Sequence, residues 1–431
     1  MNRRTFIFTA GAALSKTAAG ANDRIHMVVV GVRGRGREHI EIYGKLPNST
    51  VAGVCDIDSA QSERAAALAE KVQGRKPKEY RDIRQVLDDK SVDAVSIATC
   101  NHWHALAAIW ACQAGKDVYV EKPASHNIFE GRKMVEAARK YNRIVQVGMQ
   151  SRTTEHKRRG IELLRQGVIG RIYQAKGLCF KRRLSIGKSP NGPVPPGVDY
   201  DLWLGPAPMR PFNPNRFHYN WHWFWDTGNG DIGNQGVHEM DIARWGLGKS
   251  TLPKSVFSSG GKFIYDDDQE TPNTQLATFD YGDSQLVFEV RGLITGNEGA
   301  IGPEAGGNVI GNIFLGSEGY MSMDLEGFQV FLGEKREPGP SMKFAEAKRW
   351  DTAPHMANFQ QAMRTRRQAD LTGDIEEGHL SAALCHLANI SYRTGRKLAF
   401  DSATESFRGD GEANGHLSRK YRAPYVVPEK A

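Results

Sequence analysis

The chain has 431 residues, of which 40% are hydrophobic and 25% are charged, and its formal net charge is +8. This composition excludes a largely disordered chain, and the length exceeds one ordinary hydrophobic core, so we expect two domains. Basic residues occur in short clusters, as at 157–159 and 181–183, which argues against a nucleic-acid partner. The five cysteines are widely spaced and predict neither a disulfide framework nor a metal site.

Residues 1–21 have the features of an export signal. Arg3 and Arg4 precede a weakly apolar stretch rich in Ala and Gly, and residues 19–21 give a small-x-small cleavage pattern. The paired arginines, together with Lys16 inside the apolar stretch, favour the twin-arginine type. A disordered cytoplasmic tail is the alternative. We therefore expect a periplasmic protein, and no later run is long enough to span a membrane.

Short apolar runs alternate with amphipathic stretches over residues 22–150, which predicts βαβ units around a parallel sheet. We expect strands at 25–30, 51–55, 92–98, 118–120 and 144–147, and helices at 59–71, 103–113 and 128–141.

The pattern changes over residues 151–431, where alternating stretches favour a largely antiparallel sheet and hence an α/β fold in two parts. Segments 188–214 and 292–311 are rich in Gly or Pro and are expected to be loops. We expect strands at 172–181, 277–281 and 285–290, a helix at 154–166, and two late helices flanking this sheet at 355–366 and 375–394.

A glycine-rich turn follows the first strand. Residues 31–36 read Gly-Val-Arg-Gly-Arg-Gly, and a helix is expected to begin near Arg37. Free N–H groups at a helix N-terminus favour a pyrophosphate, although Arg33 occupies the position of the middle glycine in the G-x-G-x-x-G fingerprint. Asp56 ends the second strand and is placed to accept hydrogen bonds from the adenosine ribose, which favours NAD over NADP. Arg33 and Arg35 leave NADP open.

Four further motifs resemble those of the Gfo/Idh/MocA oxidoreductases. They are Ala-Thr-Cys-Asn-His-Trp-His at 98–104, Gly-Lys-Asp-Val-Tyr-Val-Glu-Lys-Pro at 115–123, Gln-Val-Gly-Met-Gln at 146–150, and the Gly-Asn-Gly-Asp stretch that begins at 228 and ends at 241. The resemblance implies a Rossmann domain followed by an open-sheet α/β domain that often forms homo-oligomers. With the glycine turn, it implies a cofactor site made of Gly31, Arg33, Gly34, Gly36, Asp56, Ala98, Asn101, His104, Glu121, Lys122 and Gln150.

The same resemblance suggests the catalytic residues. In that family the lysine of Glu-Lys-Pro lies beside the nicotinamide and the substrate hydroxyl, which implies a proton-handling role for Lys122, with a lowered pKa. The family usually has Asp four residues before His, whereas this chain has Asn234 before His238. Because Asn cannot take a proton, we expect His238 to be the base and Asn234 to orient a hydroxyl. Asp231 and Asp241 are possible substitutes for the missing carboxylate.

Three tryptophans with a spacing of two precede this motif. On a strand they would share one face, which suits either a carbohydrate platform or a sheet core or oligomer interface. The residues that we expect to bind substrate are Tyr219, Trp223, Trp225, Asp231 and His238.

Export after folding leaves little free NAD to exchange, so we expect a tightly bound cofactor that is recycled in place. Our first hypothesis is an oxidoreductase acting on a hydroxyl of a small carbohydrate or cyclitol. The second is an NAD-dependent glycosidase, in which transient oxidation acidifies a neighbouring C–H, the aglycone is eliminated, and hydride returns. The third is a non-catalytic ligand-binding relative, which only Asn234 favours.

Overall fold

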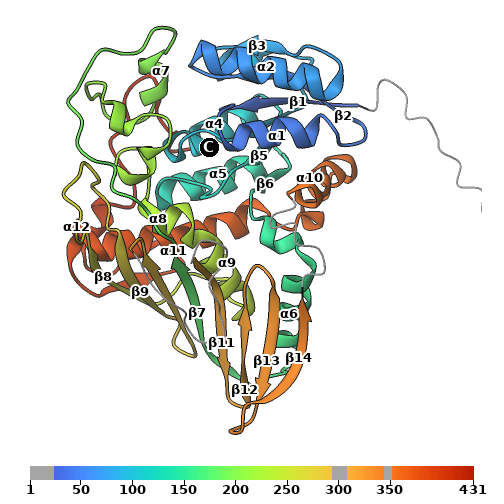
Figure 1. Cartoon of the computed structure of the whole chain (residues 1–431). Helices are drawn as coiled ribbons and strands as arrows, with labels where there is room; N and C mark the ends of the chain where they lie inside the picture. Colours follow the sequence, from blue (N-terminus) through green and yellow to red (C-terminus); the bar gives the residue numbers. More distant parts are fainter. Residues whose placement is uncertain (1–23, 294–307, 344–351) are drawn as a thin grey trace, which may run out of the picture.

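The computed structural model describes residues 24–293, 308–343 and 352–431. The expected signal at 1–21 and most of the expected loop at 292–311 lie outside these residues. The described residues form two sheets, which Figure 1 shows above and below the long helix α11 (Ile375–Thr394). No helix in these ranges is long and apolar enough to cross a membrane.

The first sheet is parallel, with the strand order β3-β2-β1-β4-β5-β6. Strands β2 and β3 are added on one side of β1, and strands β4, β5 and β6 on the other, so the strand order reverses between β1 and β4. Ligands bind at the carboxyl ends of the strands at such a point. Its strands are β1 (Ile25–Val30), β2 (Ser49–Cys55), β3 (Lys78–Tyr80), β4 (Ala94–Ile97), β5 (Asp117–Val120) and β6 (Val145–Val147). Its helices are α1 (Arg35–Tyr43), α2 (Ser59–Gln73), α3 (Ile83–Asp88), α4 (Asn101–Gln113) and α5 (Ile128–Lys140).

Every strand and helix expected over residues 22–150 is present, with ends that differ by at most two residues. Helices cover both faces of a parallel sheet, so its central strands are rich in apolar residues, and Met27, Val28 and Val29 of β1 are all fully buried. Helix α2 begins at Asp58, whose side chain accepts from the amide of Ala60, and it ends at Gly74 in a left-handed conformation.

The second sheet is mostly antiparallel, with the strand order β14-β13-β12-β11-β7-β10-β9-β8-β15-β16. Strands β7 and β10 pair in parallel. The two-sheet α/β fold class predicted from the sequence is confirmed. The strands are β7 (Ile172–Phe180), β8 (Ser255–Gly261), β9 (Thr274–Asp280), β10 (Gln285–Arg291), β11 (Val309–Gly316), β12 (Gly319–Met323), β13 (Gly327–Leu332), β14 (Glu337–Lys343), β15 (Leu398–Asp401) and β16 (Ser406–Phe407).

The helices after residue 150 pack against both sheets. The helices expected at 154–166, 355–366 and 375–394 are present, and the expected loop at 292–311 gives way to strand β11 at Val309. The elements are η2 (Gln150–Thr153), α6 (Glu155–Arg165), α7 (Tyr200–Leu204), η3 (Pro214–Arg216), η4 (Asn220–Trp223), α8 (Gly230–Asn234), α9 (Gly236–Gly246), α10 (Ala353–Thr365), η5 (Gln368–Asp370), α11 and α12 (Gly411–Gly415).

Helix α10 does not flank the second sheet, so that expectation was wrong. Its apolar side chains Met356 and Phe359 belong to the same buried cluster as Met27 and Val29 of strand β1, and Figure 1 shows α10 beside the first sheet. The reason is that periodicity identifies the apolar face of a helix without identifying its partner. Segment 421–427 also returns to the first sheet, where Tyr425 packs edge-on against Trp103.

Residues 195–221, which we call the crossing segment, contact the first sheet. The Gly197 carbonyl accepts from the amide of Ser59 at 3.1 Å, and the amide of Asp199 donates to the Ile57 carbonyl at 2.9 Å. The Trp103 indole donates to the Leu202 carbonyl at 2.9 Å. Figure 1 shows α7, inside this segment, beside β3 and α2. The segment therefore covers the carboxyl end of β2.

Candidate active site

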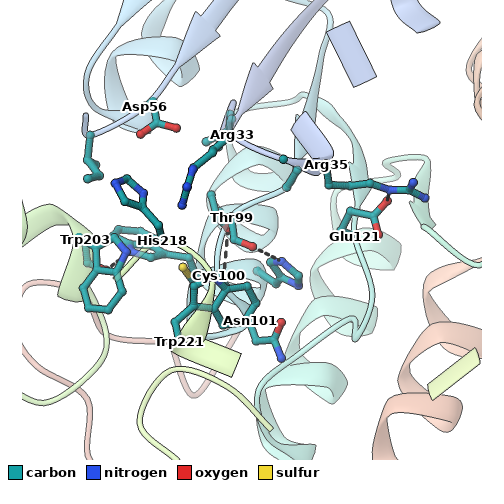
Figure 2. Close-up of a pocket in the computed structure, with 18 of the residues that line it drawn as sticks. Arg33, Arg35, Asp56, Thr99, Cys100, Asn101, Glu121, Trp203, His218 and Trp221 are labelled. Atoms are coloured by element: carbon teal, nitrogen blue, oxygen red, sulfur yellow. Dashed lines mark hydrogen bonds and ion pairs between the residues drawn. The ribbon is translucent and has the colours of Figure 1, made fainter. Parts of the chain in front are cut away.

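A cavity of about 880 Å³ lies between the carboxyl ends of the first sheet's strands and the crossing segment. Figure 2 shows Asp56 and Arg33 on one side, across from His218 and Trp203 of the crossing segment. The cavity brings together most of the residues predicted from the sequence, from both parts of the chain. Its lining includes Gly31, Arg33, Gly34, Asp56, Ala98, Asn101, His104, Glu121, Lys122, Tyr219, Asn234 and His238.

Two glycines of the turn are required by close backbone contacts. Gly31 has φ +80°, and a Cβ there would lie 2.8 Å from the backbone of Ala98 and Thr99. A Cβ at Gly36 would lie 1.9 Å from the Gly31 carbonyl oxygen, so Gly36 shapes the turn from behind the cavity. Gly34 precedes α1, and no side chain caps that helix. The turn therefore leaves a helix N-terminus open to the cavity although Arg33 replaces the usual glycine.

The Asp56 carboxylate lies at the end of β2 beside the glycine turn. Its two oxygens accept from the amides of Val32 at 2.9 Å and Asp58 at 3.0 Å. Burial raises the pKa of Asp56, and these amide hydrogen bonds oppose the rise. A carboxylate oxygen has more than one lone pair, so Asp56 can still accept hydrogen bonds from a ligand in the cavity.

The Glu121 carboxylate forms a buried ion-pair cluster. Its Oε1 lies 3.1 Å from Arg35 Nε, 3.2 Å from His39 Nε2 and 3.3 Å from Gln150 Nε2. Burial alone would raise the pKa of Glu121, but the Arg35 charge and the His39 contact hold it well below its usual range. Figure 2 shows Arg35 reaching Glu121. The Arg35–Glu121 ion pair fixes the end of strand β5, next to Lys122. Gln150 lies behind Glu121, outside the cavity lining.

The Lys122 amine is the group with the most useful chemistry in the cavity. Its Nζ donates to the backbone carbonyl of Asn234 at 2.7 Å. Loss of solvent lowers the pKa of Lys122 to about 8, with nearby Arg35 and Arg183 adding to the effect and Glu121 opposing it. Burial, followed by the Lys122 charge, lowers the pKa of His238 well below its usual range. Near neutral pH, Lys122 can therefore exchange a proton, whereas His238 stays uncharged.

Neither aspartate substitutes for the carboxylate that Asn234 replaces. The Asp231 oxygens accept from Arg183 at 2.9 and 2.6 Å, and Oδ1 also accepts from the Asn234 amide at 3.2 Å. Asp241 is buried in an ion pair with Arg152, whose nitrogens approach to 2.8 Å. Asp231 lies one hydrogen bond behind Asn234 and is not part of the cavity lining.

We predict that Asn234→Asp will destabilise the protein. The new carboxylate would face Asp231 Oδ1 without the amide donor, and the loss of one buried hydrogen bond costs about 1–3 kcal/mol. Asn234→Ala, which loses the bond without adding a charge, is the matched control and is expected to cost less. Urea unfolding of both variants measures the difference, and a more stable aspartate variant would contradict this interpretation.

The tryptophan series does not lie on a strand. Trp221 and Trp223 belong to the 3₁₀ turn η4, in which the amide of Phe224 donates to the Trp221 carbonyl at 3.4 Å. The Thr227 hydroxyl donates to the same carbonyl at 2.9 Å. Trp221 lines the cavity, whereas Trp223 packs under the Arg183 guanidinium and Trp225 under that of Arg393. The structure thus places Trp223 and Trp225 outside the cavity lining, unlike Trp221.

Sequence reasoning missed several residues of the cavity lining. Most of these missed residues lie in the crossing segment or directly after it. The sequence feature that could have indicated them is a group of aromatic and histidine residues after a Pro-rich loop. They include Cys100, Trp203, His218, Trp221 and His222.

Two family descriptions match the chain. The description "Oxidoreductase family, NAD-binding Rossmann fold" matches residues 25–149, and "Oxidoreductase family, C-terminal alpha/beta domain" matches residues 166–281 and 328–427. Together they cover most of the chain.

The chain is similar to several sugar-processing proteins. It is 28% identical to levoglucosan dehydrogenase of Pseudarthrobacter phenanthrenivorans over 41% of this chain and 39% of that protein. It is 24% identical to a glycosyl hydrolase family 109 protein of Saccharopolyspora erythraea over 39% of this chain and 37% of that protein. Each alignment thus spans less than half of the relative's length.

Solved structures share the fold over nearly their whole length. A levoglucosan dehydrogenase in complex with NADH and levoglucosan superposes with a TM-score of 0.65 at 18% identity, covering 87% of this chain and 99% of that one. Aldose-aldose oxidoreductase from Caulobacter crescentus, complexed with glycerol, gives a TM-score of 0.66 at 15% identity, with 88% and 100% covered.

Proposed function

This chain belongs to the Gfo/Idh/MocA oxidoreductase family, and we propose that it moves a hydride between NAD and a hydroxyl-bearing carbon of a sugar or cyclitol. One observation carries the proposal. The Lys122 amine lines the same cavity as the glycine turn, and its pKa is lowered to about 8 by desolvation. Oxidation of an alcohol needs a group in that place that takes the hydroxyl proton.

The residues of the cavity fit NAD. Gly31 and Gly36 have room for hydrogen only, which allows the tight turn before α1. The N-terminus of α1 has no side-chain cap and can meet a pyrophosphate. Asp56 has lone pairs for the adenosine ribose hydroxyls, and its charge disfavours the 2′-phosphate of NADP. When bound, NAD supplies the hydride acceptor and donor.

The side chains around the substrate divide the work of proton transfer. The neutral Lys122 amine takes the hydroxyl proton during oxidation and returns it during reduction. Asn234 positions Lys122 through its backbone carbonyl. His238, kept uncharged by burial and by Lys122, orients the hydroxyl rather than acting as the base, which revises the role that we expected from the sequence.

We propose further that the cofactor remains bound between turnovers. The crossing segment covers the carboxyl end of β2, where backbone hydrogen bonds join residues 197 and 199 to residues 57 and 59. The similar aldose-aldose oxidoreductase is named for two aldoses, which suits a cofactor that is recycled in place.

We predict that Trp103→Phe will speed the loss of bound NAD about three- to tenfold. The change removes the indole donor to the Leu202 and Trp203 carbonyls and keeps an aromatic ring, and one hydrogen bond contributes about 0.5–1.5 kcal/mol. Trp110→Phe is the control, because Trp110 packs edge-on against Trp103 and lies outside the cavity lining. Rapid dilution of protein loaded with NADH, followed by nicotinamide fluorescence, measures release. Equal rates for the two variants would argue against the crossing segment as the barrier.

The function is tested on the purified protein with its own nicotinamide. We expect levoglucosan, myo-inositol or D-glucose to change the absorbance of the bound cofactor, and a second sugar or its oxidised form to restore it. A protein that carries no nicotinamide and binds none when NAD is added would contradict the proposal.

A glycosidase that uses transient oxidation is the second candidate, because the chain resembles a glycosyl hydrolase family 109 protein. Product analysis with aryl glycosides separates the two. Release of the aryl group without net cofactor reduction identifies the glycosidase, and an oxidised sugar identifies the dehydrogenase. Sugar binding without either reaction would identify the non-catalytic alternative.

We also propose that residues 1–21 direct export to the periplasm through a twin-arginine pathway, on the basis of the Arg3-Arg4 pair. Replacing both arginines by lysine should keep the protein in the cytoplasm, as cell fractionation would show.

We propose a homo-oligomer as well. The outer face of the second sheet exposes Tyr173, Phe257 and Leu276, and sedimentation measures the oligomeric state.

A further inference from the structure

His222 is held rigidly at the edge of the cavity. It lies in the 3₁₀ turn η4, and its ring stacks on Trp221 with centroids 3.5 Å apart. A Cβ at Gly228 would lie 2.5 Å from the His222 Cα, so the next turn of chain packs directly behind its backbone. Its side chain lines the cavity with Lys122 and His238.

The hydrogen bond to the backbone determines the tautomer of His222. Nδ1 lies 2.6 Å from the Tyr219 carbonyl oxygen. A carbonyl only accepts hydrogen bonds, so Nδ1 carries the proton, and in the neutral ring Nε2 then presents a lone pair. Nε2, on the opposite edge of the imidazole, is therefore an acceptor.

The surroundings keep this acceptor uncharged. Burial lowers the pKa of His222 to about 3, and the cationic Lys122 and Arg183 contribute in the same direction. An imidazole with so weak a basicity serves poorly as a catalytic base at neutral pH, but it remains a good hydrogen-bond acceptor.

We infer that Nε2 of His222 accepts a hydrogen bond from a second hydroxyl of the substrate, while the reacting hydroxyl lies at Lys122. This inference rests on the proposed function and specifies, within its substrate class, a second hydroxyl group that is recognised at the acceptor of His222. His222 is thus a residue that determines specificity, and not a base.

Two variants test the roles of Nδ1 and Nε2 of His222 separately. The amide nitrogen of Asn takes the place of Nδ1 and leaves Nε2 empty, whereas the longer Gln side chain can place its amide oxygen near Nε2. The probes are D-glucose, levoglucosan and myo-inositol, each with its monodeoxy analogues. Calorimetry measures binding, and the absorbance of the bound nicotinamide measures hydride transfer.

We expect the native protein to bind one monodeoxy analogue about tenfold more weakly than its parent sugar, as for one lost hydrogen bond. His222→Asn should bind the parent sugar about tenfold more weakly and no longer distinguish it from that analogue. His222→Gln should regain part of the affinity for the parent and part of the discrimination. If His222→Asn binds the parent sugar and all its analogues equally more weakly, it still discriminates between them as the native protein does, and the inference is overturned. If the native protein binds the sugars and discriminates between them without hydride transfer, the proposed function alone is contradicted. If the native protein binds none of the probes, the proposed function and the inference about His222 are both contradicted.

Discussion

Replacing Lys122 with Met is expected to lower the rate of hydride transfer about 10²- to 10⁴-fold, the usual contribution of a positioned proton-transfer group. The variant keeps a side chain of similar length but has no group that can take the hydroxyl proton. The turn at 31–36 and Asp56 are unchanged, so the bound nicotinamide should remain. Single-turnover reduction of that nicotinamide by the sugar measures the effect.

The control for this variant is Lys116→Met. Lys116 is also buried, but its amine donates to the carbonyls of Asp89 and Val92 at the opposite end of the first sheet. The rate of hydride transfer should not change in this variant, even if it unfolds at a lower urea concentration. Native rates in Lys122→Met would remove Lys122 from the mechanism.

The same assignment gives a pH dependence with opposite signs in the two directions. Oxidation needs the neutral amine, so with a pKa of about 8 the rate should rise about tenfold per unit of pH below 8 and level off above it. Reduction of the oxidised sugar needs the protonated amine, so its rate should fall above pH 8. A profile that turns over near pH 6 instead would indicate a histidine base.

Gly36→Ala is expected to weaken NAD binding roughly 10- to 100-fold. Its methyl group would lie 1.9 Å from the Gly31 carbonyl oxygen, and overpacking of this kind costs about 1–3 kcal/mol. Because the clash is with backbone, the turn at 31–36 has to move away from the position in which it meets a pyrophosphate. The nicotinamide content after gel filtration and a titration with NAD measure the loss.

The matched control is Gly74→Ala. Gly74 also lies in the first half of the chain, at the end of α2, with a positive φ and open space around its Cα. This variant should lose about 1 kcal/mol of stability and keep its full nicotinamide content. If both variants retain NAD equally, the close contact at Gly36 is not required for cofactor binding.

The sequence predicted those parts of the site that depend on local pattern. The glycine turn, Asp56 and Lys122 each lie at the end of a strand in a βαβ unit, and the order of a parallel sheet places such strand ends along one edge. Neighbouring residues along the chain were enough to identify the strands, and the resemblance to known oxidoreductases identified the lysine.

The parts that failed depend on contacts between distant segments. His222 and Trp221 reach the cavity only because the crossing segment lies over β2, which no pattern within residues 195–221 indicates. Spacing of two suggested a strand for the tryptophans, but a strand needs a partner for its backbone. Here the Trp221 carbonyl accepts from the nearby Phe224 amide and Thr227 hydroxyl instead. The sequence left Asp231 as a possible base, and its ion pair with Arg183 became known only from the structure.

The packing of α10 and of segment 421–427 against the first sheet also bears on the order of events during synthesis. Domains generally fold in the order in which they emerge from the ribosome, but here Phe359 and Tyr425 complete clusters that contain β1 and α4. The nucleotide-binding half therefore gains these buried side chains only after residues 359 and 425 have been synthesised. A nascent chain released early would leave apolar surface exposed, and it would lack the packing that supports the cofactor cleft. If NAD is loaded before export, loading has to follow the synthesis of residue 425.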